Sequence, residues 1–338
     1  MVSLSVSKSR AFEQDGLRPV NLRTDLAPLA DLIELAFVDS MDSNGRAAVR
    51  EMRTLSRMGP GLTMLAGVND LTQGISLGYV WIADGRLVGN VSIYPANYPV
   101  SVGSAWIIAN VAVHPDYRGR GIATQMMQAS LDMVRQRGGH IAVLQVDYDN
   151  EVARRLYERL GFVYERAWSH WRRAYSSHVP DSFDDPSVYI TRRRRVDWRS
   201  EYELAQHIRP AENGGLGWLR PLHVGLFRKS LGSHIGEWLT LRSVERLVIH
   251  SEDERDVLAS LWIENTLALS TVQLTLLVDP DYEGLYDEAL LNLAVRRFGK
   301  RQPISIEHPA YAPVTNALFE RYQFRHQRTL AHMRWQPD

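Results

Sequence analysis

The chain has 338 residues, of which 45% are hydrophobic and 23% charged, and its 39 basic and 39 acidic residues cancel to a formal net charge of zero. This length predicts two domains, since an average domain has roughly 150 residues, and the neutral balance excludes a global field that would draw the protein to nucleic acid or to an anionic membrane. The absence of cysteine excludes disulfides, thiolate metal sites and cysteine nucleophiles, and no apolar run approaches the roughly 20 residues that span a bilayer, so we expect a soluble, cytoplasmic protein.

Four strand patterns and two helical patterns precede residue 114. The strands are expected over residues 17–23, 79–84, 86–94 and 104–113, and the helices over residues 24–37 and 49–58. Thr24 or Asp25 can cap the first helix, and Pro28 is tolerated in its first turn. The last of these strands is continuously apolar and short, which predicts a buried central strand.

The chain then alternates up to a polar segment and repeats its plan beyond it. Expected elements are a helix from residue 122 to the glycine pair 138–139, a strand over 141–146, a helix over 150–160 and strand character over 162–173. The segment 174–187 is rich in Ser, Asp and Pro, which predicts a linker. Beyond it, strand candidates lie at 245–250 and 271–278, and helical candidates lie at 201–208, 286–299 and 317–324. We therefore predict an α/β protein with domains over residues 1–175 and 186–338.

A buried strand that opens into a helix through closely spaced glycines is typical of an anion site. Here the strand ending at Val113 is followed by Arg118-Gly119-Arg120-Gly121 and a helical pattern. Because glycine lacks a Cβ atom, the backbone can turn sharply and present N–H groups at the positive end of the helix to an oxygen-rich ligand. A Walker loop is excluded because G-K-[ST] is absent, and a dinucleotide fingerprint is excluded because five residues separate the strand from the first glycine.

Two segments carry a resemblance to a known family. They read VAVHPDYRGRGIA over residues 111–123 and NEVARRLYERLGF over residues 150–162. Together they resemble the GCN5-related N-acetyltransferase (GNAT) superfamily, whose acetyl-CoA loop is [RQ]-x-x-G-x-[GA] at the start of the helix after the fourth strand. The resemblance covers residues 17–173 and implies a mixed, mostly antiparallel twisted sheet flanked by helices.

The same resemblance implies a site for acetyl-CoA. In this family the fourth and fifth strands splay apart, and the pantetheine arm bonds to main-chain groups of the fourth strand. The diphosphate lies on the glycine-containing loop, an asparagine touches the arm, and a tyrosine protonates the departing thiolate. The cofactor-binding residues implied here are Val111, Ala112, Val113, Arg118, Gly119, Arg120, Gly121, Ile122, Ala123, Thr124 and Asn150, and the implied catalytic acid is Tyr157.

The later segment VDPDYEGLYDEA, residues 278–289, repeats the frame of VHPDYRGRGIAT, residues 113–124. The repeat keeps the positions that hold the fold and changes those that would hold the cofactor, since a carboxylate and a bulky ring would now face a diphosphate. We interpret residues 186–338 as a degenerate second GNAT-like domain with a structural role. The exchanged positions are Arg118 to Glu283, Gly121 to Tyr286, Asn150 to Ala312 and Tyr157 to Phe319.

Amine attack on a thioester needs a neutral amine, an oxyanion donor and an acid for the sulfur, and it needs no covalent enzyme intermediate. The expected function is therefore transfer of an acetyl group from acetyl-CoA to a small-molecule or peptide amine in a ternary complex. The alternative is a non-catalytic acyl-CoA sensor or assembly module. We expect no metal, no nucleic-acid or membrane partner, and a monomer or homodimer.

Three assignments stay open at this point. Tyr157 could be only a core aromatic, and Asn150 could be only a helix cap. The general base is not determined, because the strand over 104–113 contains no acidic residue. The candidates are Asp147, Asp149, His114 and a chain of water molecules.

Overall fold

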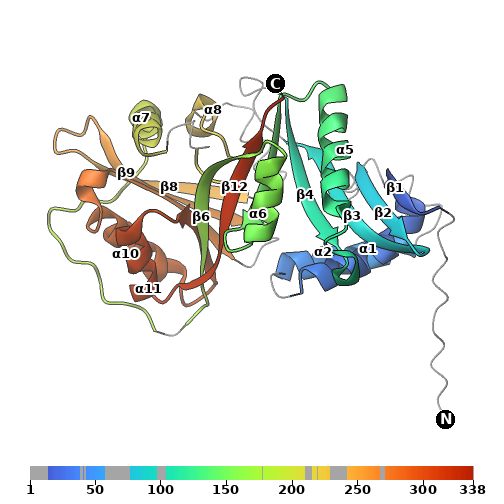
Figure 1. Ribbon diagram of the computed structural model, residues 1–338. Helices are drawn as coiled ribbons and strands as arrows, with labels where there is room; N and C mark the ends of the chain where they lie inside the picture. The colour runs from blue at the N-terminus through green and yellow to red at the C-terminus, as the bar shows by residue number, and fades with distance from the viewer. Residues whose placement is uncertain are drawn as a thin grey trace, which may run out of the picture. The chain divides into compact units, whose positions relative to one another are not determined.

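The computed structural model describes most of the chain and divides it into two compact units (Figure 1). Unit 1 comprises Met1–Leu144, Arg155–Val163 and Arg334–Asp338, and unit 2 comprises Gln145–Arg154 and Tyr164–Met333. These units follow contacts in space, whereas the domain limits given above follow the sequence repeat and stay a prediction. The described residues are 14–38, 41, 43–57, 77–96, 104–176, 178–209, 215–218, 220–228, 242–266 and 271–337.

Unit 1 contains a five-stranded sheet in the order β1-β2-β3-β4-β5, in which only β4 and β5 are parallel. Strand β5 begins in unit 1 and ends in unit 2, whereas helix α6 begins in unit 2 and ends in unit 1. The elements are β1 (Gly16–Pro19), α1 (Leu22–Ala36), α2 (Ser43–Ser56), β2 (Gly78–Ala83), β3 (Arg86–Pro95), β4 (Ala105–Val113), the 3₁₀ turn η3 (Pro115–Tyr117), α5 (Ile122–Gln136), β5 (Ile141–Asp147) and α6 (Glu151–Arg159).

Helices α1 and α5 cover opposite faces of this sheet. Leu32 of α1 packs with Val80 and Ile82 of β2. Successive side chains of a strand point to opposite faces, so Trp81 lies on the other face, where it and Met126 of α5 both approach Gly89. Helix α1 packs in turn on α2, which shields its second apolar side. The core of unit 1 therefore has two layers, one on each side of β2 and β3.

The start of α1 differs from the sequence prediction. The helix begins at Leu22, and Asn21 caps it by accepting the Arg23 N–H at 3.0 Å. Asp25 is buried instead and pairs with Arg18 at 2.7 Å, so it does not cap as predicted. Thr24 does not cap the helix either, and Pro28 lies in the helix interior rather than its first turn. The Asp25 carboxylate also accepts the main-chain N–H of Asn21 at 2.7 Å, so it bonds to the residue that caps the helix.

Unit 2 contains the strand order β12-β6-β11-β10-β9-β8-β7, with the end of β5 beside β12. The strands β10 and β11 are parallel, whereas β10 with β9, β11 with β6, β7 with β8 and β8 with β9 are antiparallel. The elements are β6 (Val163–Arg173), β7 (Thr191–Arg192), η4 (Arg195–Asp197), α7 (Trp198–Ile208), α8 (Val224–Phe227), β8 (Arg242–His250), β9 (Val257–Thr266), β10 (Val272–Val278), η6 (Pro280–Tyr282), α10 (Tyr286–Phe298), β11 (Ile304–Pro309), α11 (Pro313–Arg321) and β12 (Arg325–Trp335).

The strands β6 and β12 lie side by side within unit 2. In the sequence, β6 follows α6 and ends the first repeat, and β12 follows α11 and ends the second repeat. The structure therefore places the last strand of both repeats in the same unit. Within the described residues, no helix combines the length and the apolar character needed to cross a bilayer.

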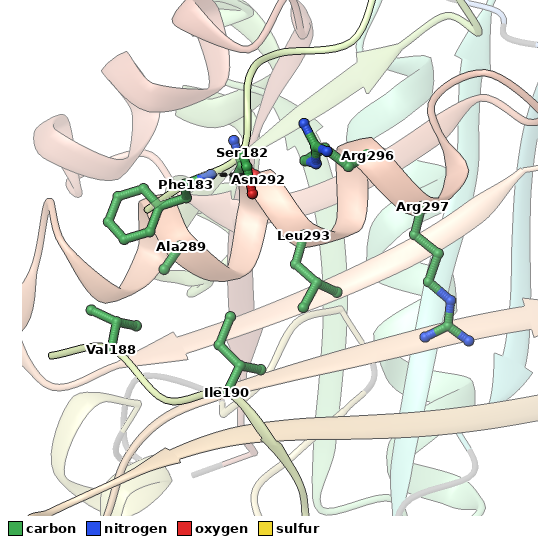
Figure 2. A pocket seen from close by; sticks show the side chains of 9 residues that line it. All are labelled: Ser182, Phe183, Val188, Ile190, Ala289, Asn292, Leu293, Arg296 and Arg297. Carbon is green, nitrogen blue, oxygen red and sulfur yellow. Dashed lines mark hydrogen bonds between the residues drawn. The ribbon is translucent and has the colours of Figure 1, made fainter. Parts of the chain in front are cut away.

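The predicted linker packs on α10 in unit 2. Buried Asn292 donates to the Asp181 carbonyl at 2.8 Å and accepts the Phe183 N–H at 3.2 Å. Beside this crossing lies a hollow of about 540 Å³ (Figure 2), whose apolar wall includes Leu293 and Ile190. Arg297, which lines the hollow, is already paired with Glu245 at 2.6 Å. The hollow thus lacks a cluster of available reactive groups and is distinct from the motif of residues 113–124.

Candidate active site

The strands β4 and β5 separate part of the way along their length. They pair in parallel only where residues 105–107 face residues 141–143. Beyond Ile107, β4 continues to Val113 with β3 on one side and no β5 partner in register on the other. On the side that β5 has left, no strand pairs with this stretch, which contains the predicted contacts Val111, Ala112 and Val113. Two of its carbonyls are engaged by side chains, that of Asn110 by Asn90 and that of Val113 by Arg118.

A β-bulge interrupts β4 inside this unpaired stretch. Asn90 of β3 faces Ala112 and Ser92 faces Ala109, so two residues of β4 oppose Val91 alone. Asn110, one of the two, has φ of 52°, a left-handed conformation that asparagine tolerates better than most residues. The bulge redirects the backbone of β4 at the point where it has left β5.

The predicted anion loop follows β4 directly. After η3, Gly119 and Gly121 have φ of 75° and 76°, and α5 begins at Ile122 with no side-chain cap. Within the described residues, the main-chain N–H groups of residues 119–124 have no hydrogen-bond partner. Unpaired N–H groups at a helix N-terminus favour an anion through both their donors and the helix dipole.

The loop also has room and positive charge for a diphosphate. A Cβ atom on Gly119 would meet nothing within 4 Å, and one on Gly121 would meet only the Gln125 side chain at 3.9 Å. Arg118 donates its Nε to the Val113 carbonyl at 3.2 Å, and Arg120 donates to the Asp116 carbonyl at 3.0 Å. Both arginines are thereby held at the loop, and the residues present fit the diphosphate of a coenzyme A thioester.

Tyr157 lies on the buried side of α6, within unit 1. Its side chain is 6% exposed and packs against Phe162, with ring centroids 5.9 Å apart. Burial raises the pKa of the Tyr157 phenol well above its ordinary value. The phenol therefore keeps its proton throughout the physiological range, as a general acid must before it acts.

The remaining predicted site residues have local structural contacts. Asn150 accepts the Ala153 N–H at 3.1 Å and so caps α6; it belongs to unit 2, and its contact with the cofactor stays a prediction. His114 accepts the Asp116 N–H at 3.3 Å and caps η3. Asp147 and Asp149 also belong to unit 2, and a role for either as the base stays a prediction.

The second repeat keeps the turn but fills the anion nest with its own carboxylate. Gly284, at the position of Gly119, also has positive φ, at 91°. The fully buried Asp287 accepts the N–H groups of Gly284 at 2.7 Å and Glu288 at 3.0 Å, and the hydroxyl of Thr315 at 2.8 Å. A side chain thus takes the donors that the first repeat leaves unpaired. Sequence comparison identified Glu283 and Tyr286 as obstacles and missed Asp287.

The strands β10 and β11 of the second repeat also pair over only part of their length, where residues 272–274 face residues 304–306. Arg209, at the end of α7, is 8% exposed, and burial lowers its pKa to about 10. Its guanidinium lies 5.4 Å from the ring centroid of Trp168. Phe319 replaces the acid and is fully buried, so the second repeat has neither an open nest nor a phenol at this position.

Comparison with known proteins agrees with this geometry. Residues 62–162 match the family described as Acetyltransferase (GNAT) family. N-alpha-acetyltransferase 30 of Schizosaccharomyces pombe is 48% identical over 65 residues, which cover 19% of this chain and 43% of that protein. The L-amino acid N-acyltransferase MnaT of Escherichia coli is 26% identical over 149 residues, which cover 42% of this chain and 76% of that protein. The chain thus spans less than half of the first of these relatives.

Solved structures resemble almost the whole chain. A GCN5-related N-acetyltransferase from Sphaerobacter thermophilus has a TM-score of 0.58 at 15% identity, with 95% of each chain covered. A tandem GNAT protein from the clavulanic acid biosynthesis pathway has a TM-score of 0.51 at 13% identity, with 96% of this chain and all of that chain covered. At such identities the likeness shows the fold alone. Residues 62–162 thus belong to the GNAT acetyltransferase family, and the fold of the chain as a whole is similar to that of GNAT proteins, one of them a tandem GNAT protein.

Proposed function

We propose that the first repeat transfers an acetyl group from acetyl-CoA to a primary amine of a small molecule or peptide, by direct attack in a ternary complex. One observation carries this proposal. Among the described residues, the N–H groups of residues 119–124 are unpaired in the first repeat, whereas two of the equivalent donors in the second repeat, those of Gly284 and Glu288, are bonded to Asp287. The contrast within one chain supports a diphosphate ligand for the first nest.

In this proposal, different residues of unit 1 bind acetyl-CoA and donate the proton. The nest and its arginines hold the diphosphate, and the main chain of β4 from Val111 to Val113, on the side that β5 has left, receives the pantetheine arm. As the amine nitrogen bonds to the acetyl carbon, the carbon–sulfur bond breaks, and the Tyr157 phenol gives its proton to the sulfur. The proton lost by the nitrogen returns to the phenolate. Orientation of the two substrates supplies most of the remaining acceleration.

Acetyl-CoA binding tests the location of the diphosphate. Gly121→Tyr copies the second repeat and puts a bulky side chain at φ of 76° among the free N–H groups. Charge-assisted hydrogen bonds contribute about 1.5–3 kcal/mol each, so we expect the Kd measured by calorimetry to rise about a hundredfold or more. Gly138→Tyr is the matched control, because Gly138 has φ of 68° and open surroundings at the other end of α5. Equal affinity of the two variants would contradict the proposed site.

The alternative function is a non-catalytic acyl-CoA sensor or assembly module. A coenzyme A release assay over a panel of primary amines separates the two functions. An enzyme releases the thiol in an amine-dependent manner, whereas a sensor binds acetyl-CoA and releases no thiol with any amine. The buried, protonated Tyr157 supports the enzyme, because a sensor has no need of an acid at that position.

A further inference from the structure

Asn110 has a backbone conformation that calls for an explanation. In the described part of the chain, the non-glycine residues with positive φ are Asp84, Asn110, Glu254 and Gln323, and all except Asn110 lie in turns. A residue held in this sparsely populated conformation inside a strand requires surrounding contacts that fix it. Such residues often mark functional sites, and Asn110 lies in the stretch of β4 that has separated from β5.

A network of three polar side chains fixes the bulge. Asn90 donates its Nδ2 to the Asn110 carbonyl at 2.8 Å and to Ser92 Oγ at 3.4 Å. Asn110 donates its own Nδ2 to Ser92 Oγ at 3.3 Å. Asn90 is 1% exposed and Ser92 is 2% exposed, whereas Asn110 is half-buried. The network thus turns the amide nitrogen of Asn110 toward Ser92 and leaves its side-chain oxygen without a hydrogen-bond partner among the described residues.

No available carboxylate accompanies Asn110 on α1, α5, β3 or β4, whereas His114 at the end of β4 and Asp147 at the end of β5 stay candidate bases. The strand itself has no acidic residue, and Tyr94 of β3 is a half-buried phenol whose pKa burial raises. The carboxylates of α1 and α5 are engaged by arginines. The pairs are Asp25 with Arg18, Asp31 and Glu34 with Arg53, and Asp132 with Arg135.

We propose that Asn110 binds the acceptor amine through its side-chain oxygen, with Asn90 and Ser92 as positioning residues, and that the acceptor is the α-amino group of an amino acid or peptide. This inference rests on the acetyl transfer proposed above. An amide oxygen accepts an N–H hydrogen bond and directs the nitrogen lone pair, but it does not remove a proton. An amine that meets Asn110 and no general base must therefore arrive as the free base.

The need for a free base selects among amines by their pKa. An α-amino group has a pKa of roughly 7.7–8.0, and a lysine side chain has a pKa of roughly 10.4. At pH 7.5 about a third of the former and about 0.1% of the latter are unprotonated. This difference gives α-amines an advantage of about two hundredfold without any contact that distinguishes the two acceptors.

The test compares two acceptor probes over pH 6 to 9.5. One is a tetrapeptide amide with a free α-amino group, and the other is Nα-acetyl-lysine methylamide. With the wild-type protein, we expect kcat/KM for the peptide to rise about tenfold per pH unit below about pH 7 and to level off above about pH 8, and to exceed that for the lysine derivative by about a hundredfold or more at pH 7.5. A rise governed by an enzyme group at the same pH for both probes would overturn the proposal.

Two variants of Asn110 sharpen the test, since both tolerate its backbone conformation. Asn110→Gly removes the amide; we expect kcat/KM to fall about tenfold or more with the same pH slope and with an unchanged Kd for acetyl-CoA. Asn110→Asp supplies a carboxylate that can act as a base, so the pH slope should flatten below pH 7 and the selectivity between the probes should fall. Wild-type rates and slopes in both variants would contradict a role for Asn110.

The positioning role of Ser92 has its own readout. Ser92→Ala should lower kcat with the peptide while leaving the pH slope and the acetyl-CoA Kd unchanged, and Ser92→Thr should restore much of kcat because it keeps the hydroxyl. Turnover of neither probe by a wild-type protein that binds acetyl-CoA would contradict the α-amino assignment. Absence of acetyl-CoA binding would contradict the proposed function itself.

Discussion

Tyr157 and Phe319 occupy equivalent positions in the two repeats, and both are buried. The phenol and the phenyl ring fill the same kind of space, since they lie at corresponding positions of α6 and α11. Each of these helices ends before a strand that continues its repeat. The hydroxyl is therefore unnecessary for packing at this position. Its retention in the first repeat alone is best explained by chemistry.

Tyr157→Phe tests this reading. Because the second repeat already uses phenylalanine, the free energy of unfolding should change by less than about 1 kcal/mol, while the loss of a positioned acid should lower kcat roughly 10²- to 10⁴-fold. Calorimetry with acetyl-CoA should show an unchanged Kd. A variant with wild-type kcat would show that Tyr157 is a core aromatic.

The pH dependence of kcat should reflect the raised pKa of the phenol. Since burial raises this pKa, the acid form persists to higher pH than that of an exposed tyrosine, which ionises near pH 10. The wild-type protein should therefore show no decline of kcat from phenol ionisation between pH 8 and about 10. A decline in this window that disappears in Tyr157→Phe would contradict the assignment.

The turns η3 and η6 have the same structure but precede helices that start differently. Both have the sequence Pro-Asp-Tyr, and each is capped by the preceding side chain, His114 in one case and Asp279 in the other. The backbone therefore reaches the next helix in the same way. After the turn the two loops differ: among the described residues α5 starts with unpaired donors, whereas at the start of α10 Asp287 is bonded to the N–H groups of Gly284 and Glu288.

Asp287→Ala should reopen the second nest. The N–H groups of Gly284 and Glu288 lose their acceptor, and an unsatisfied buried donor costs about 1–3 kcal/mol. Inorganic phosphate should restore part of this stability by occupying the vacated position. Urea unfolding with increasing phosphate measures both effects.

Asp279→Ala is the matched control for the second nest. It also removes a carboxylate, which accepts the Asp281 N–H at 3.0 Å, but it opens no nest. The free energy of unfolding of Asp279→Ala should fall, and added phosphate should not restore it. An equal phosphate response in the two variants would show that Asp287 does not occupy an anion site.

At the scale of the whole molecule, unit 2 buries neutral histidines. His332 is 1% exposed; burial, together with Arg166 and His170, lowers its pKa to about 2. His308 is 4% exposed, and burial together with Arg209 lowers its pKa well below the ordinary value. In the unfolded chain both histidines titrate near pH 6.5, so the unfolded state binds more protons below that pH.

Stability should therefore be complete above about pH 6.5 and should fall as the pH decreases, by up to about 1.4 kcal/mol per pH unit for each histidine. His308→Leu removes one of the two contributions, so the slope of unfolding free energy between pH 6 and 5 should decrease by up to that amount. Urea unfolding at a series of pH values measures the slope. His178→Leu, which changes an exposed side chain, should leave the slope unchanged, and an unchanged slope in His308→Leu would contradict the prediction.

The anion loop, the buried strands and the repeat could all be predicted because they depend on neighbouring residues. The nest needs only contiguous residues with glycine at the positive-φ positions, and Gly119 and Gly121 have that conformation. The family assignment rests on the same local motifs. The start of α1 was predicted wrongly, because the helix begins at Leu22 with Asn21 as its cap, and the buried Asp25 bonds instead to Arg18 and to the main-chain N–H of Asn21.

The sequence by itself determined the GNAT-family match, the position of the loop and the residues exchanged between the two repeats, because each is expressed in short motifs. Only the tertiary structure decided that Asn90 and Ser92 fix Asn110, that Asp287 fills the second nest, and that β6 and β12 are neighbours in unit 2. These features arise from hydrogen bonds between distant residues or from the conformation of single residues. Hydrophobic periodicity carries no information about either, since it records which face of an element is buried and not which partner it meets.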